Sequence, residues 1–392
     1  MGISSKISLL GTETAFDVLA RAAKLSASGM DVINLGIGQP DFPTPDAIVQ
    51  AGIDALKNGH HGYTAANGTQ ELREAVAQDI LKYRGVPVSA DNILIMPGGK
   101  PTMSFAIELF GEAGAEILYP NPGFPIYESM IRYSGAKPVP IPLLEEQGFS
   151  FDADQVLSLV NNNTRLIILN SPANPTGGIV DKRQLEKLVD GLKRWPDVYI
   201  LSDEIYSRMT YDGQQHVSLL SFSDLRERLI ILDGWSKTYA MTGWRLGWGL
   251  WPEHLVPEVT KLCVNYHSCV NAAAQMAGIT ALTMDQSPVN EMMYAFNERR
   301  LLIHQRLNDM PGISCVLPKG AFYAFPNIQG TGKTAKELQD ILLNEQGVAS
   351  IAGTSFGSFG EGYLRFSYAN SLDNINKAMD RVDAVARQLA KG

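Results

Sequence analysis

The hydrophobic pattern in the middle of the chain is that of an α/β protein. Short strand-like runs recur at 93–96, 115–119, 137–142, 165–170, 198–202 and 229–233, and the last three are apolar at nearly every position. Such runs are typical of strands buried on both faces, as in a parallel sheet covered by helices. A helical pattern at 183–195 separates two of them. We therefore expect an α/β fold with a mostly parallel mixed sheet.

The pattern changes towards both ends of the chain. Helices are expected at 14–29, 71–83, 289–307, 335–346 and 373–389, and short strand-like segments precede the last helix. A chain of 392 residues exceeds one ordinary hydrophobic core, so two domains are expected. We predict a large domain over 45–288 and a smaller α+β domain built from 1–44 and 289–392.

Composition narrows the possible partners. The net charge of -8 and the lack of any Lys/Arg run argue against a nucleic-acid surface. The sequence contains no run of about 18 apolar residues, so no membrane span is predicted. The start of the chain lacks an export signal, and the three cysteines form no CxxC pair. The histidines show no metal-ligand spacing, so we expect a cytoplasmic protein without a metal site.

The run at 93–96 leads into a glycine-rich turn. Gly98 and Gly99 allow the backbone to approach a ligand, and Lys100 begins a predicted helix. The unpaired N–H groups of a helix start bind anions. A plain tight turn is the alternative explanation of this segment taken alone.

Polar residues also follow the three most apolar strands. Asn174 comes after 165–170, Asp203 and Tyr206 come after 198–202, and Lys237 and Arg245 come after 229–233. Taken alone, Lys237 would be explained more simply as a surface residue. Because ligands of α/β sheets bind at the carboxyl ends of the strands, these residues are expected to converge. Together they fit a ligand with a phosphate, a carbonyl and a protonatable ring nitrogen.

Several motifs resemble those of one enzyme family. SKTYAMTGWRLG and NSPANPTG, supported by DEIY, GYTAANGTQELREA and RFSY in the expected order, are similar to motifs of class I aminotransferases. The likeness covers nearly the whole chain and is strongest to the bacterial aspartate-aminotransferase-like branch, which consists of fold type I enzymes that use pyridoxal 5′-phosphate. It implies transfer of an amino group between an L-amino acid and a 2-oxo acid, with 2-oxoglutarate as acceptor, by a ping-pong route.

The resemblance implies roles around the cofactor ring. Lys237 would form a Schiff base with the cofactor and later carry a proton between the substrate Cα and the cofactor. Asp203 would keep the ring nitrogen protonated. Tyr206 and Asn174 would hydrogen-bond the ring's 3′-oxygen, and Phe124 would stack on the ring.

The cofactor phosphate has its own set of implied ligands. Arg245 would bind it together with the backbone N–H groups of Gly98, Gly99 and Lys100. Tyr63 resembles a phosphate ligand that the partner subunit supplies. The resemblance therefore implies a homodimer whose active sites are shared across the interface.

The resemblance also implies ligands for the substrate carboxylate, and the chain departs from the family pattern at one phosphate ligand. Arg365 would hold the substrate α-carboxylate as a bidentate pair, assisted by Asn174 and the Gly36 backbone. Many relatives carry a serine three residues before the Schiff-base lysine, where this chain has Gly234. Ser236 is the candidate replacement for that phosphate-binding hydroxyl.

The substrate side chain is not identified by the sequence. No arginine matches the one that reads the distal carboxylate of aspartate or glutamate in some branches. Glu13 lies near the expected position of that side chain and would repel a dicarboxylic substrate there. An exposed residue at a helix start is the more common role for such a glutamate.

Two other functions share the same motifs. A C–S β-lyase on this scaffold would need Lys237, Asp203 and Arg365 as well. A non-catalytic cofactor-binding relative is the third hypothesis. Such relatives usually carry an added DNA-binding segment, and the intact Lys237 and the lack of a basic region argue against this one.

Overall fold

The computed structural model describes residues 2–11 and 14–391. Its largest sheet consists of β2 Ile93–Met96, β3 Glu116–Asn121, β4 Lys137–Pro142, β5 Thr164–Asn170, β6 Tyr199–Asp203, β7 Leu229–Gly234 and β8 Gly247–Leu250. The strand order is β2-β8-β7-β6-β5-β3-β4. Neighbouring strands from β7 to β4 are parallel, whereas β8 is antiparallel to both of its neighbours. The predicted α/β fold, its mixed and mostly parallel sheet, and the six predicted strands are confirmed.

Strand β8 was not predicted, because glycine occupies every second position of its sequence GWGL. These glycines allow close packing. A Cβ atom on Gly247 would lie 2.5 Å from the carbonyl carbon of Gly98, and one on Gly249 would lie 2.4 Å from the Trp251 Nε1. Glycine has a low β propensity, but at these positions it allows the turn at Gly98 to lie directly against the strand.

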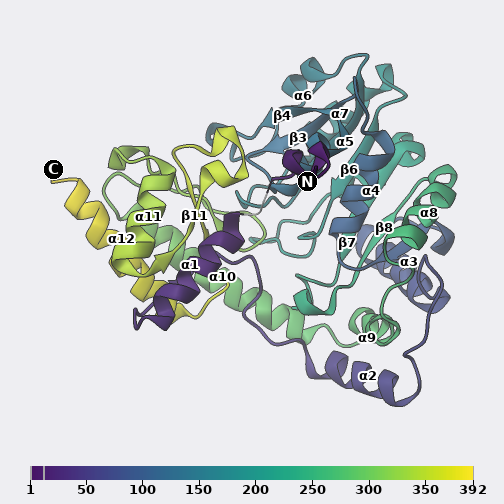
Figure 1. Cartoon of the computed structure of the whole chain (residues 1–392), viewed down its shortest axis with the longest axis horizontal. Coiled ribbons are helices and arrows are strands. Elements are labelled where there is room, and N and C mark those ends of the chain that lie inside the picture. Colours follow the sequence, from purple (N-terminus) through teal and green to yellow (C-terminus); the bar gives the residue numbers. More distant parts are fainter. Residues whose placement is uncertain (1, 12–13, 392) are drawn as a thin grey trace.

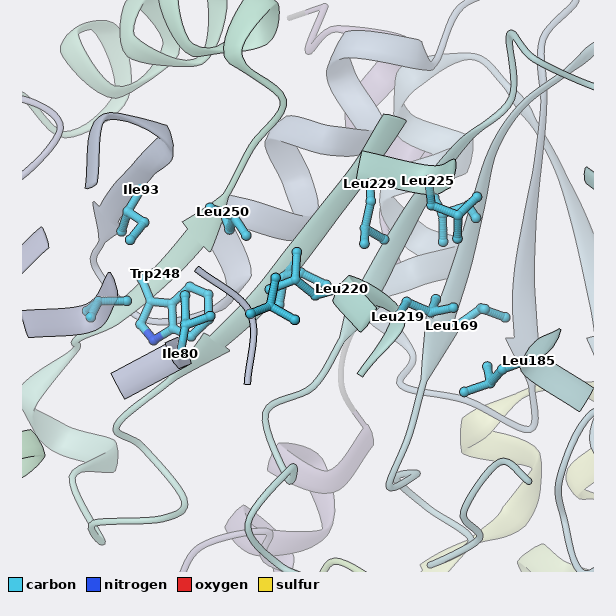
Figure 2. Packing of buried hydrophobic residues seen from close by; sticks show 14 of the residues in the cluster. Ile80, Ile93, Leu169, Leu185, Leu219, Leu220, Leu225, Leu229, Trp248 and Leu250 are labelled. Carbon is cyan, nitrogen blue, oxygen red and sulfur yellow. The ribbon is translucent and has the colours of Figure 1, made fainter. Parts of the chain in front are cut away.

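Helices cover both faces of the sheet (Figure 1). Alternate residues of β5 point to opposite faces, with Ile167 and Leu169 in one cluster of buried side chains and Leu166 and Ile168 in another. Figure 2 shows part of the first cluster, which includes Trp248 of β8 and Ile80. The first face is covered by α3 Gln70–Arg84, α6 Ala153–Leu159, α7 Lys182–Gly191 and α9 Ala272–Thr283, and the second by α4 Lys100–Phe110, α5 Ile126–Ser134 and α8 Val256–Tyr266.

Helix α9 was not predicted for a physical reason. Its sequence AAAQMAGITALT is apolar on all sides, so it lacks the periodic pattern of a half-exposed helix. The helix packs between α2 Asp46–Lys57 and α3, which accounts for its uniform character. Helix α2 was likewise not predicted.

The two ends of the chain pack together. Strand β1 Ile33–Asn34 pairs in parallel with β10 Val348–Ala349. A second small sheet has the order β11-β12-β9, with β11 Ile351–Ala352, β12 Leu364–Ser367 and β9 Tyr323–Ala324. The surrounding helices are α1 Thr14–Ala27, α10 Ser287–Asn308, α11 Ala335–Gln346 and α12 Leu372–Leu389, close to the predicted bounds. Figure 1 shows α1, in purple, beside α11 and β11. None of the described helices is long and apolar enough to cross a membrane.

The division into domains at 44/45 and 288/289 stays a prediction. In its favour, β9, α10, α11 and α12 share one cluster of buried side chains that also includes Ile33 and Leu35. Tyr206, Met209 and Tyr211 extend from the large sheet into the same cluster. The proposed smaller domain is therefore packed firmly against the larger one.

Candidate active site

The predicted site residues gather around one cavity of about 470 Å³ at the carboxyl ends of the parallel strands. The residues that line it include Gly99, Lys100, Phe124, Asn174, Asp203, Tyr206, Ser236, Lys237, Arg245 and Arg365. The structure thus brings together residues that lie up to 266 positions apart, counted from Gly99 to Arg365. Gly98 and Gly36 are not in this lining, but each is next in the chain to a residue that is, Gly99 and Ile37 respectively.

Tyr63 is not among the residues that line this cavity. Tyr63 is 94% exposed on the single chain, which agrees with a residue that acts in a partner's site. Glu13 lies outside the described residues, so its proposed position near the substrate side chain stays a prediction.

Asp203 ends β6 and points into the cavity from a buried position. The Tyr127 hydroxyl donates to its Oδ2 at 2.6 Å, and the Ile205 N–H donates to its Oδ1 at 3.2 Å. Burial raises the pKa of the Asp203 carboxyl to about 6, although both donors favour the ionised form. A cation placed opposite this carboxylate would therefore be strongly stabilised.

Lys237 follows β7 and reaches across the cavity to the N-terminal segment. Its Nζ donates to the Gly38 carbonyl. The same ammonium lies 5.9 Å from the centre of the Tyr206 ring and 5.8 Å from that of Phe322. The lysine predicted to be the chemical centre is held between the sheet and the terminal segments.

The Tyr206 hydroxyl lies 2.8 Å from that of Tyr323 in β9. Burial, followed by the influence of Tyr323, raises the pKa of Tyr206 well above its ordinary value. The phenol is therefore neutral near neutral pH and able to donate a hydrogen bond.

The start of α4 is a candidate anion site. Gly98 has φ 89° and Gly99 is the N-cap of the helix, so the unpaired N–H groups of the first turn begin where Gly99 and Lys100 line the cavity. A Cβ atom on Gly98 would lie 2.2 Å from the Arg245 Nη2. Arg245 itself has φ 55°, and its Nη1 donates to the Thr242 carbonyl at 2.7 Å. Glycine at 98 lets the guanidinium lie against this turn, where it adds a positive charge to the anion site.

Gly234 has a structural reason for its departure from the family pattern. A Cβ atom on it would lie 2.8 Å from the Gly247 Cα, because β7 and β8 are closely packed at this point. A serine would therefore require the two strands to move apart. Ser236 lines the cavity and can offer a hydroxyl there.

Arg365 belongs to β12 and is 3% exposed. Its Nη1 donates to the Asn174 Oδ1 at 3.0 Å and its Nη2 donates to the Gly36 carbonyl at 2.5 Å. The guanidinium carbon also lies 4.7 Å from the centre of the Tyr323 ring. Arg365 therefore contacts both of the residues that were predicted to assist it.

Sequence reasoning missed two tyrosines of this site. Tyr127 binds Asp203, and Tyr323 contacts both Tyr206 and Arg365. Tyr127 lies only three residues after Phe124, and its N–H donates to the Phe124 carbonyl at 3.1 Å at the start of α5, so proximity in the sequence was a usable signal. For Tyr323 the signal was weaker, because nothing in GAFYAFP shows which alternate residues face the cavity.

Comparisons with known proteins agree with this geometry. The family model described as aminotransferase class I and II matches residues 30–382. The chain is 40% identical to an aspartate aminotransferase of Pyrococcus horikoshii over 383 residues, which covers 97% of this chain and 96% of that one. It is 35% identical to the aspartate aminotransferase of Bacillus subtilis, covering 97% and 98%. The chain belongs to the class I and II aminotransferases.

Solved structures extend the likeness to the whole fold. The aspartate aminotransferase of Thermus thermophilus with maleate superposes with a TM-score of 0.93 at 31% identity, covering 98% of this chain and 100% of that one. An alanine aminotransferase from Pyrococcus furiosus gives a TM-score of 0.93 at 32% identity, covering 99% and 100%. The fold is fold type I, and the protein is a transaminase that uses pyridoxal 5′-phosphate, amino acids and 2-oxo acids. The lyase hypothesis is not favoured, and the non-catalytic hypothesis is wrong.

The cavity fits this cofactor. Pyridoxal 5′-phosphate supplies an electron sink for the bonds at the substrate Cα. The anion site at Gly98 and Gly99, the carboxylate of Asp203 and the amine of Lys237 match its phosphate, its ring nitrogen and its aldehyde. Gly98 has φ 89°, a left-handed conformation that an L side chain rarely adopts, so the turn at the start of α4 needs glycine at this position.

Proposed function

We propose that one set of cavity residues binds the cofactor and another binds the substrate. Lys237 anchors the cofactor covalently and moves the proton at the substrate Cα, and Asp203 holds the proton on the ring nitrogen. The observation that carries this proposal is the placement of both residues on one cavity at neighbouring strand ends. The sheet fixes both groups, so their geometry is set before substrate binds.

The remaining cofactor contacts follow from position. Phe124 lines the cavity and stacks on the ring, while Asn174 and Tyr206 hydrogen-bond its 3′-oxygen. The neutral Tyr206 phenol suits a donor to an oxygen that carries negative charge. Ser236 supplies the phosphate-binding hydroxyl that is missing at Gly234.

Phosphate binding is assigned to the start of α4. The N–H groups of Gly98, Gly99 and Lys100 and the guanidinium of Arg245 bind the phosphate oxygens. Proximity of Gly98 to the Arg245 Nη2 supports one common site.

The substrate α-carboxylate binds Arg365. The fork of its guanidinium pairs with both carboxylate oxygens, and Asn174 and Gly36 hold it in the correct orientation. The same residues accept 2-oxoglutarate in the second half of a ping-pong reaction. Similar proteins are named for aspartate, aromatic amino acids and alanine, and the donor of this enzyme is of that general kind.

The active form is a homodimer with shared sites. Tyr63 is exposed on one chain and completes the phosphate site of the other. Helix α2 carries Val49, Ile53 and Leu56 on one exposed face, at spacings of four and three residues. An exposed apolar face of this kind is typical of an interface.

Hybrid dimers test the shared site. A dimer of one Lys237→Ala subunit and one Tyr63→Ala subunit contains one site with both residues intact and one site with neither. Purified with two different affinity tags, it is expected to show about half the wild-type activity at limiting cofactor. Activity no higher than half that of the Tyr63→Ala homodimer would mean that the sites are not shared.

The location is also part of the proposal. Cys263, Cys269 and Cys315 are all free thiols. Free thiols suit the reducing environment of the cytoplasm. Labelling the thiols of protein taken directly from cells, before any reductant is added, tests this.

A further inference from the structure

A buried ion cluster lies behind the proposed active site. Arg84, the last residue of α3, has a side chain that is 5% exposed. Its Nε donates to the Glu204 Oε2 at 2.9 Å and its Nη2 donates to the Asp233 Oδ2 at 2.5 Å. The Glu204 and Asp233 side chains are 0% and 8% exposed. A single cation therefore pairs with two carboxylates in the interior of the protein.

The two carboxylates belong to the strand ends that carry the chemistry. Glu204 directly follows Asp203 at the end of β6. Asp233 is the next-to-last residue of β7, four residues before Lys237. The Glu204 N–H also donates to the Leu232 carbonyl at 2.8 Å. The guanidinium carbon of Arg84 lies 5.5 Å from the centre of the Trp248 ring in β8. Arg84 thus contacts three neighbouring strands at their functional ends.

Hydrogen bonds keep both carboxylates in place. Ser202 and Ser218 donate to the Glu204 Oε1 at 3.0 and 2.8 Å. Ser207 donates to the Asp233 Oδ2 at 3.0 Å. Burial alone would raise the pKa of Glu204, but His216 and Arg84 outweigh it and lower that pKa below its usual value. Glu204 is therefore charged in the folded protein.

These charges act on Asp203. Burial is the main cause of its raised pKa, and the charges of Asp233 and Glu204 add to it. Other titratable or charged groups facing this region are Tyr127 from α5, Tyr206 after β6, Lys237 after β7, His216 beside Glu204, and Arg208, which acts on Asp233. Arg84 is the cation that pairs directly with both neighbouring carboxylates of Asp203.

We propose that Arg84 is a positioning residue for the reaction: it fixes the ends of β6 and β7 against each other and offsets their negative charge, so that Asp203 stays ionised opposite the cofactor's ring nitrogen. This inference rests on the proposed role of Asp203. Arg84 touches neither the cavity nor the substrate, so it acts only through Glu204 and Asp233.

The test separates an electrostatic effect of Arg84 on Asp203 from a general loss of stability. Arg84→Gln removes the cation, and Arg84→Gln/Asp233→Asn removes one carboxylate as well, which restores the charge balance. Arg300→Gln is the matched control, because Arg300 is also buried and paired, with Asp212, away from the cavity. Three quantities are measured: the acidic midpoint of the kcat/KM profile, the Kd for pyridoxal 5′-phosphate by tryptophan fluorescence at each pH, and Tm.

Without the cation, Asp203 takes up a proton at higher pH. Arg84→Gln should therefore raise the acidic midpoint of both profiles by roughly one pH unit. The double variant should return the midpoint towards the wild-type value even where Tm stays low. Arg300→Gln should lower Tm and leave the midpoint unchanged. A purely structural role predicts instead that both Arg84 variants lose activity in step with Tm, with no shift of the midpoint.

Two more variants keep the inference testable if Arg84→Gln does not fold. Asp233→Asn alone removes a repelling charge and should lower the acidic midpoint, and Arg84→Lys should keep it near the wild-type value. A rise in the midpoint for Asp233→Asn would overturn the inference. Asp203→Asn separates the two levels: if it leaves activity and cofactor affinity unchanged, the proposed role of Asp203 fails. If it abolishes both while Arg84→Gln shifts nothing, only the role of Arg84 fails.

Discussion

The two sides of the cavity are built in different ways. The sheet side presents Asn174, Asp203 and Lys237 at the ends of β5, β6 and β7, three neighbouring parallel strands of the mixed sheet. The terminal side presents Arg365 and Gly36, which are 329 residues apart in the chain and in direct contact in the fold. The sheet side suits a cofactor that stays bound, whereas the terminal side, joined to it by contacts such as that of Arg365 with Asn174, suits a substrate that comes and goes.

The largest effect is expected on the sheet side, for Lys237→Ala. Without the amine there is no covalent anchor and no group to move the Cα proton, so activity should fall roughly 10⁴-fold or more. The conversion of bound cofactor by an amino acid in a single turnover measures it. Lys187→Ala, at an exposed lysine, is the control. Turnover close to wild type in the Lys237 variant would refute the assignment.

Asp203→Asn tests the second residue of the sheet side. Losing the carboxylate should lower kcat roughly 10² to 10³-fold, as when one preorganised charge is removed from an active site. In the ligand-free wild type, burial puts the Asp203 pKa at about 6. A raised carboxyl pKa means that the ionised form is lost as pH falls, so cofactor affinity should weaken below about pH 6.

The pH dependence gives this prediction a second check. Cofactor Kd, measured between pH 5 and 8, should change around the Asp203 pKa in the wild type and lose that change in Asp203→Asn. The same titration midpoint in both proteins would assign the ionisation to another group.

On the terminal side, Arg365→Lys should act mainly on substrate binding. A lysine keeps the charge but lacks the fork, and a lost charge-assisted hydrogen bond corresponds to a rise in KM of roughly 10 to 100-fold. Steady-state kinetics with several amino acids, varied at fixed 2-oxo acid, separates KM from kcat. An unchanged KM would show that another group holds the carboxylate.

The smallest effect is expected at the start of α12, at a residue that does not line the cavity. The Ser371 hydroxyl accepts a hydrogen bond from the Asn374 N–H at 3.2 Å, so Ser371→Ala should reduce the free energy of unfolding by about 1 kcal/mol. Kinetic constants should not change. Denaturant unfolding measures the loss, with Gln388→Ala in the last turn of α12 as control. Equal stability in both variants would mean that the cap contributes nothing.

The comparison also explains what the sequence could predict. The strand ends were predictable, because apolar runs mark each strand and the residue after each run is therefore known to lie at the sheet edge. Arg365 and Gly36 were named only through the resemblance, since no local pattern pairs residues so far apart. Strand β8 and helix α9 were missed because glycines and uniform burial remove the periodic pattern. Tyr127 was missed although it lies only three residues after Phe124.

The central claim is that this enzyme transfers amino groups. The most direct test mixes the enzyme, loaded with pyridoxal 5′-phosphate, with one amino acid and no 2-oxo acid, and follows the cofactor absorbance and the released products. The account predicts that about one equivalent of 2-oxo acid forms per active site, that the cofactor ends in its pyridoxamine form, and that the reaction then stops. Continued release of ammonia and pyruvate would contradict it and identify a lyase.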